Sequence, residues 1–193
     1  MKKSILVMAL LLISLVSYSQ REGAFRVGMD LGYVPASGGA GISYYIEPKY
    51  NIKDNMNVGF RIGGAAIARD IEDFGGSTFV TATGIGSYLG TFDYYFPNGK
   101  SFVPFVGGGL GYVGALSVRA DEDTDVSGQS VTGGFGGVIR GGFEWGKFRM
   151  GLEYNLVPKS KLYYGSIESN EDISNSYFAI TLGFYVGGGK WGK

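Results

Sequence analysis

The chain has 193 residues, enough for one domain with a sizeable core, and it contains neither histidine nor cysteine. These two absences exclude histidine-based catalytic triads, histidine metal sites, disulfide bonds and a lipid anchor on cysteine. The 17 basic and 17 acidic residues cancel, so no positive excess points to nucleic acid, and the 35 glycines follow no collagen-like period of three.

The first 19 residues are typical of a secretory signal peptide. Lys2 and Lys3 form a charged start, residues 5–16 form an apolar run, and we predict cleavage near Ser19-Gln20. The apolar run is too short to span a bilayer as a helix, which takes roughly 20 residues. Removing the two lysines leaves 15 basic residues against 17 acidic ones, a net charge of −2.

The rest of the chain alternates bulky apolar residues with small or charged ones, which is the period of a β-strand. Eight such segments are predicted, at about 24–34, 41–50, 56–66, 79–95, 102–114, 138–145, 148–155 and 176–187. The clearest is the hairpin 138–155, which reverses at 146–147. There, Phe148 and Leu152 alternate with Arg149 and Glu153, so the hairpin has one apolar face and one charged face.

Two segments depart from regular alternation. Pro48 lies within 41–50 and predicts a strand end or a locally unpaired position, because proline has no amide hydrogen. In 79–95, Leu89 falls on the polar face, so we predict a bulge in the upper half of that strand.

The connections differ in length in a regular way. The third, fifth and seventh are long and polar, whereas short turns lie at 53–55, 97–100 and 146–147. In an up-and-down meander the odd-numbered connections all lie at one end, and outer-membrane barrels have short periplasmic turns and longer extracellular loops. We therefore predict an all-β fold: an eight-stranded antiparallel up-and-down transmembrane barrel over 21–187, followed by a short periplasmic tail, 188–193.

Such a barrel either encloses its apolar face, as soluble lipocalin-like barrels do, or turns that face toward lipid. The apolar face carries about four large side chains per strand, which would overfill an eight-stranded interior. The charged face is rich in glycine and leaves room for the few long side chains. Because a lipid-facing arginine or lysine at mid-depth costs roughly 2–4 kcal/mol, we expect the charged face inside and the apolar face in lipid.

Aromatic residues gather on the apolar face near the short-turn end. Aromatic girdles at the membrane–water interface have this layout, whereas a mere preference of aromatic residues for strands predicts no common level. The predicted girdle comprises Phe25, Tyr50, Tyr94, Phe96, Phe102, Trp145, Phe148 and Phe184.

The inward face carries five residues of each charge. An unpaired buried charge costs several kcal/mol, so this balance predicts an ion-pair network that fills the lumen. A catalytic or ion-conducting site among the carboxylates is the alternative, although no pair of nucleophile and base stands out. The predicted network comprises Arg26, Asp30, Glu47, Lys49, Arg61, Asp93, Arg140, Glu144, Arg149 and Glu153.

The fifth connection contains Asp121, Asp123 and Asp125 at the first ligand spacings of an EF-hand loop. Val126 replaces the glycine that such a loop requires, and Thr132 replaces its bidentate glutamate. A solvated acidic loop is therefore favoured over a loose divalent-cation contact, and no metal site is predicted. The seventh connection mixes charged and aromatic residues and is either a ligand surface or an ordinary exposed loop.

Four segments resemble the strand repeats of the small outer-membrane β-barrel proteins of Gram-negative bacteria, the OmpX/OmpW-like group. They are YYIEPKYNIKDNMNVGFRIGG (44–64), FDYYF with VPFVGGGLGY (92–112), FRMGLEYNLVP (148–158) and YFAITLGFYVGGGK (177–190). The resemblance covers 21–187 and implies a monomeric barrel in contact with outer-membrane lipid. It also implies insertion by the barrel-assembly machinery with periplasmic chaperones. One departure is that residues 187–193 extend past Phe184, whereas such barrels often end on an aromatic residue.

These observations predict a non-enzymatic barrel without cofactors that acts through its extracellular loops, in adhesion, envelope integrity or surface interaction. A narrow channel for small or apolar solutes is the alternative, and a barrel enzyme acting on lipids or peptides is less favoured. A leak through the reconstituted barrel would favour the channel. A carboxylate pair or serine cluster at the loop rim, with matching turnover, would favour the enzyme. Nothing in the sequence identifies a surface ligand.

Overall fold

The computed structural model describes residues 22–72, 78–120, 126–164 and 167–188. The described residues contain ten strands: β1 Phe25–Ala36, β2 Gly39–Lys53, β3 Met56–Glu72, β4 Thr78–Tyr95, β5 Phe102–Ala120, β6 Val126–Trp145, β7 Phe148–Leu156, β8 Ser160–Tyr164, β9 Ile167–Ile173 and β10 Tyr177–Gly187. Within those ranges, no helix is long and apolar enough to span a membrane. The predicted signal peptide and nearly all of the predicted tail lie outside the described residues.

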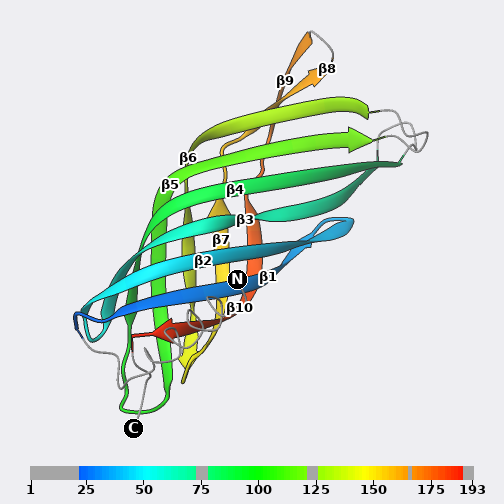
Figure 1. Ribbon diagram of the computed structural model, residues 1–193. Helices are drawn as coiled ribbons and strands as arrows, with labels where there is room; N and C mark the ends of the chain where they lie inside the picture. The colour runs from blue at the N-terminus through cyan, green and yellow to red at the C-terminus, as the bar shows by residue number, and fades with distance from the viewer. Residues whose placement is uncertain (1–21, 73–77, 121–125, 165–166, 189–193) are drawn as a thin grey trace, which may run out of the picture.

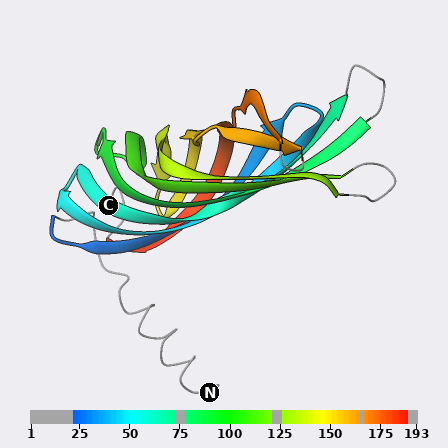
Figure 2. The same cartoon turned by 90° about the horizontal axis from the view of Figure 1, so that it is seen from above.

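Eight of the strands form a closed antiparallel ring in the order β1–β2–β3–β4–β5–β6–β7–β10. β10 closes the ring on β1, from Ile180 opposite Tyr33 to Gly187 opposite Arg26. Figures 1 and 2 show β1 to β6 as one curved wall. The predicted all-β, eight-stranded antiparallel barrel is therefore confirmed. We call the end with connections 54–55, 96–101 and 146–147 the short-turn end, and the opposite end the loop end.

The alternating sequence places every second side chain inside the ring. In β7, Phe148 and Leu152 are exposed on the outer wall, whereas Arg149 and Glu153 are buried in the lumen. The same alternation continues across the turn into β6. In the turn, Gly146 adopts a φ of 62°, which permits the tight reversal. The charged face of this hairpin is thus the inner face of a closed barrel.

Three strands extend farther toward the loop end than the alternation predicted, whereas β4 keeps the predicted bounds to within one residue. β3, β5 and β6 have 17, 19 and 20 residues, so the predicted long third and fifth connections shrink to 73–77 and 121–125. Both of these segments, including the acidic run, lie outside the described residues. Backbone pairing continues where the residues are polar, as at Thr81 opposite Arg119. Apolar alternation indicates which face of a strand meets a core or lipid, but it does not indicate how far the backbone hydrogen bonds continue.

Pro48 and Leu89 behave differently from each other. The prediction for Pro48 is confirmed, since β2 has no partner on β3 at residues 47–48 and pairing resumes at Lys49 opposite Gly59. The bulge predicted for 79–95 is wrong, because β3 and β4 pair without a register shift along their whole length. Leu89 instead faces the lumen in regular register and is 1 % exposed.

The loop end is less fully paired than the short-turn end. β6 pairs with β7 only up to Gly137, which lies opposite Leu156. Beyond that point β6 continues alongside β5, and Gln129 pairs with Tyr163 of the β8–β9 hairpin. The upper parts of β3 to β6 therefore form a curved sheet that projects past the ring, with the hairpin beyond its edge (Figure 1). The predicted long seventh connection contains this hairpin.

Candidate functional site in the barrel lumen

A layer of charged side chains crosses the lumen, and Arg140 lies at its centre. Arg140 projects from β6 and is held between carboxylates from two other strands. It donates from Nε to Asp93 Oδ1 at 2.8 Å and from Nη2 to Glu47 Oε1 at 2.6 Å, with further bonds of 3.0 Å to each partner. Charge-assisted bonds of this kind are the strong ones, and here they tie β6 to β2 and β4 across the interior.

Two more cations join the same pair of carboxylates. Lys49 Nζ lies 2.5 Å from Asp93 and 3.1 Å from Glu47, and Arg149 Nη2 lies 3.1 Å from Asp93 Oδ2. Thr91 adds a hydroxyl donor to Glu47 at 2.6 Å. Three cations therefore hold two buried carboxylates, and neither carboxylate is free to act as a base or to receive an ion.

A second pair lies nearer the short-turn end. Arg26 donates to both carboxylate oxygens of Glu144, at 2.7 and 3.1 Å, and also contacts the hydroxyl of Tyr95. Tyr95 in turn donates to Glu144 at 2.8 Å, and the Arg26 guanidinium lies 4.2 Å from the ring centroid of Tyr185. The two aromatic rings surround the ion pair, so little water reaches it.

A third pair lies toward the loop end of the charged layer. Arg61 from β3 bonds Glu153 from β7, and the Arg61 guanidinium stacks 3.4 Å from the ring centroid of Tyr45. The hydroxyls of Tyr45 and Tyr177 are 2.5 Å apart, which joins β2 to β10. These contacts span the barrel between strands that are not neighbours in the wall.

Asp30 is the one predicted lumen residue for which no ion pair within 4.0 Å is found among the described residues. It is buried, and its Oδ2 accepts no hydrogen bond from the described residues.

The lumen also holds an apolar layer that the sequence analysis missed. It lies on the loop-end side of the charged layer and consists of buried residues from six strands and the segment after β7: Val34, Ala65, Ile67, Ile85, Leu89, Val113, Ala115, Val138, Val157, Tyr177 and Ala179. At the short-turn end, Tyr95, Val103 and Phe105 pack together below the ion pairs. The sequence indicates this layer at Leu89, an apolar residue on the inward face. We interpret the apolar residue there as a sign of a bulge, whereas it marks the apolar layer.

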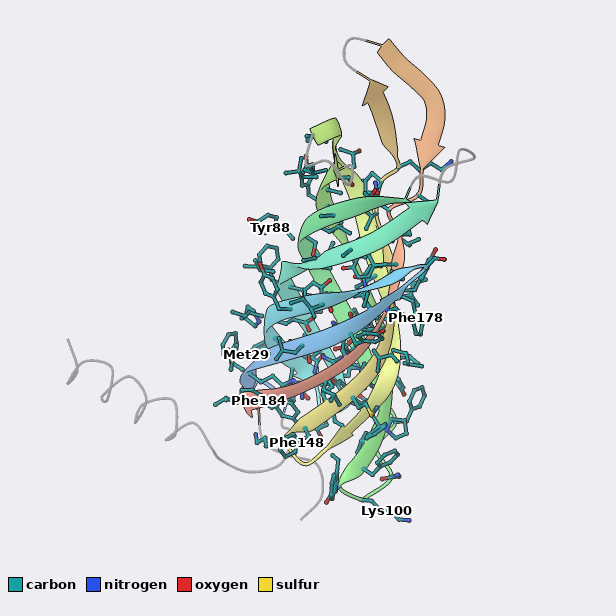
Figure 3. All side chains as sticks on the ribbon, turned by 90° about the vertical axis from the view of Figure 1, so that its right-hand side faces the viewer. Met29, Tyr88, Lys100, Phe148, Phe178 and Phe184 are labelled. Carbon is teal, nitrogen blue, oxygen red and sulfur yellow. The ribbon has the colours of Figure 1, made fainter. Side chains whose placement is uncertain are left out.

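The predicted girdle residues lie on the outer wall near the short-turn end. Phe102, Trp145, Phe148 and Phe184 are consecutive cross-strand neighbours over four strands, and Phe25 lies opposite Tyr50. Most of these side chains are exposed, and that of Phe148 is 68 % exposed. Tyr94 is half-buried, and its ring packs edge-on against the ring of Phe96, with 5.0 Å between the ring centroids. Figure 3 shows Phe148 and Phe184 on the wall at this end.

The described residues contain no group of three or more acidic, histidine or cysteine side chains arranged to hold a metal ion. The acidic run and the side chains of the seventh connection between 160 and 173 lie outside what the structure describes. The described site is thus a set of buried ion pairs between two apolar layers, with Asp30 as the one predicted lumen carboxylate outside those pairs.

Two solved structures share this architecture. The crystal structure of Neisserial surface protein A matches with a TM-score of 0.54 at 18 % identity, over 86 % of this chain and 99 % of that one. The outer membrane protein OprG from Pseudomonas aeruginosa matches with a TM-score of 0.51 at 15 % identity, over 88 % and 98 %. No protein-family model and no curated protein matches the chain.

Both neighbours are small eight-stranded outer-membrane β-barrels, so the chain has the fold that the resemblance implied. The fold, the apolar outer wall and the charged interior agree with one another. Together they place the protein in a membrane and support the predicted location in the outer membrane.

Proposed function

We propose that the chain is a non-enzymatic outer-membrane barrel whose lumen is closed and which acts through its loop end, in adhesion, envelope integrity or surface interaction. The observation that carries the proposal is the layered interior. Buried ion pairs contributed by six strands are capped by apolar side chains on one side and by aromatic ones on the other. An ion crossing this lumen would have to separate the pairs and pass an apolar layer.

The ten predicted lumen residues form the closing network in this proposal, and the eight predicted aromatic residues anchor the short-turn end at the membrane interface. The projecting sheet supports a role for the loop end, because β3 to β6 continue well beyond the closed part of the ring. The β8–β9 hairpin extends this surface and is attached to the ring through a single described register pair with β6.

The first test is planar-bilayer conductance of the refolded mature chain, after a heat-dependent gel shift has confirmed folding. We expect no single-channel steps from the wild-type protein. An Arg140→Ala variant is the matched comparison, because it removes the central cation and leaves space between Glu47 and Asp93. Steady steps in the wild type would contradict the closed lumen and support the channel for small or apolar solutes.

The second test removes the hairpin. Replacing residues 160–173 with a short glycine linker should leave the gel shift intact, because the closed ring does not include β8 or β9. We expect such cells to lose surface binding or envelope resistance as fully as cells lacking the whole protein. If the shortened barrel supports both properties at the wild-type level, the loop end is not the functional surface.

A further inference from the structure

A row of polar residues crosses the inner face of the projecting sheet, on the loop-end side of the apolar layer. Arg69 on β3 lies opposite Thr81 on β4, and Thr81 lies opposite Arg119 on β5. Arg69 keeps the strand phase of Ile67, which is buried in the apolar layer two residues earlier, so the row belongs to the inner face. The row can therefore be reached from the loop end without crossing the closed part of the lumen.

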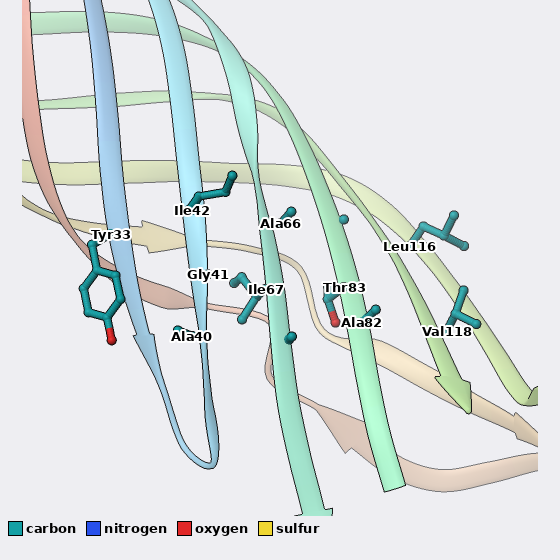
Figure 4. A pocket seen from close by; sticks show the side chains of 12 residues that line it. Tyr33, Ala40, Gly41, Ile42, Ala66, Ile67, Ala82, Thr83, Leu116 and Val118 are labelled. Carbon is teal, nitrogen blue, oxygen red and sulfur yellow. The ribbon is translucent and has the colours of Figure 1, made fainter. Parts of the chain in front are cut away.

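The neighbouring row, one step closer to the ring, marks the boundary of the apolar layer. Ile67 lies opposite Thr83 on the adjacent strand (Figure 4). Thr83 in turn lies opposite Ser117, and their two hydroxyl oxygens are 2.9 Å apart. These hydroxyls satisfy each other, so the floor beneath the row of Arg69 is already paired.

The row of Arg69 itself is not paired in this way. Arg69 is half-buried and forms no ion pair with any residue that the structure describes. Thr81 Oγ1 is buried, and it has no hydrogen-bond partner within the described ranges. A buried hydroxyl without a partner is costly. Both groups donate hydrogen bonds, so the group that complements them is an acceptor.

The charge of the row indicates that this acceptor is an anion. From β3 to β6 the row consists of Arg69, Thr81, Arg119 and Gly128, without an acidic residue. Neighbouring strands are about 4.8 Å apart, so the two arginines occupy positions roughly 10 Å apart on either side of the threonine. Two positive charges this close repel each other, and an anion between them replaces repulsion with attraction. In the lumen, by contrast, every arginine of the charged layer meets a carboxylate.

We propose that this row binds a phosphate group, with Arg69 and the hydroxyl of Thr81 as donors and Arg119 as a second positive charge in the row. A guanidinium pairs with phosphate through two parallel hydrogen bonds, and phosphate has further oxygens that accept from the threonine. A carboxylate has only two oxygens, and one arginine occupies both. Because Thr81 Oγ1 is buried, its neighbours in the row change rotamer as the anion enters.

This inference rests on the proposed role of the loop end as the functional surface, and it names phosphate as the chemistry that this surface recognises. The source of the phosphate is either the free ion or a phosphate ester on a larger molecule. The open inner face of the sheet admits both, since Arg69 and Thr81 are both partly exposed. The choice of probes below separates them.

The test is isothermal titration calorimetry of the refolded barrel in a neutral detergent at low salt, after the gel shift has confirmed folding. The probes are inorganic phosphate, glycerol phosphate and acetate. Arg69→Gln and Thr81→Val each remove one donor with little change in volume. Lys100→Gln is the matched control, because Lys100 is an exposed cation at the opposite, short-turn end of the barrel.

We expect the wild type and Lys100→Gln to bind inorganic phosphate equally, and Arg69→Gln and Thr81→Val to bind it about tenfold more weakly. Similar binding of glycerol phosphate would support the site and assign it to a phosphate ester, whereas binding of inorganic phosphate alone would support it and assign it to the free ion.

Three results would overturn the phosphate site: no binding by the folded wild type, equal binding by all folded variants, or acetate binding as tight as that of phosphate. None of these results depends on surface binding or envelope resistance of cells. The phosphate site can therefore fail while the proposed function holds. Equally, a shortened barrel that keeps both cellular properties would refute the proposed function without changing the calorimetry.

Discussion

Replacing Arg140 with methionine removes the cation at the centre of the charged layer while keeping most of the side-chain volume. In the wild type this guanidinium makes four bonds of 2.6 to 3.0 Å to Glu47 and Asp93. Lys49 and Arg149 stay in contact with both carboxylates, so the loss is smaller than the sum of four charge-assisted bonds. Breaking a buried pair by removing one partner costs about 3–5 kcal/mol, and we expect a loss of free energy of unfolding in that range.

The assay is urea unfolding in lipid vesicles, followed by tryptophan fluorescence and by the heat-dependent gel shift. Lys100→Met is the control, because Lys100 is an exposed cation at the short-turn end and its loss should change stability by less than about 0.5 kcal/mol. An Arg140→Met barrel that unfolds at the same urea concentration as Lys100→Met would refute the reasoning, since Arg140 would then not occupy a packed, ion-paired position.

Three further predictions concern other layers of the barrel. Arg61→Met and Glu153→Leu should each lower the free energy of unfolding by about 3–5 kcal/mol, because each leaves the other charge buried without its partner. The double variant should recover most of the lost stability, and additive losses in a double-mutant cycle would contradict an isolated buried pair. Leu89→Ala should cost about 2–5 kcal/mol in the same urea assay, and a cost under about 0.5 kcal/mol would show that the apolar layer is not packed. Leu152→Arg, four residues above Phe148 on the outer wall of β7, should cost roughly 2–4 kcal/mol and Phe148→Arg at the girdle about 0–1, and the reverse order would show that the assumed depth is wrong.

The facing of the charged side chains could be predicted because a strand repeats every two residues. Arg140, Glu144, Arg149 and Glu153 share a phase within a single hairpin, and all four are buried in the lumen. Their partners could not be predicted in the same way. Arg26 meets Glu144 across 118 residues of sequence, and such a pairing depends on the register and shear of the whole ring.

The apolar layer and the ends of the strands were missed for a related reason. Leu89 keeps the inward phase of β4, but we expected an inward residue to be polar, so an apolar one suggested a bulge. Toward the loop end the alternation fades in β3 to β6, while backbone pairing continues to Glu72 opposite Thr78. Hydrophobic period indicates which face meets lipid or core, but it does not indicate where hydrogen bonding between strands stops.

The central claim is that the lumen is closed to water at its apolar layer, and the absence of native cysteine allows a direct test. Ala179, fully buried in that layer, is replaced in an Ala179→Cys variant, and exposed Lys100 is replaced in a Lys100→Cys control. Both folded barrels are treated with a water-soluble maleimide, and unfolded samples of each variant serve as the reference for complete labelling. The account predicts rapid labelling of Lys100→Cys and none of Ala179→Cys until the barrel unfolds. Labelling of both variants at similar rates would show a water-filled lumen and would contradict the account.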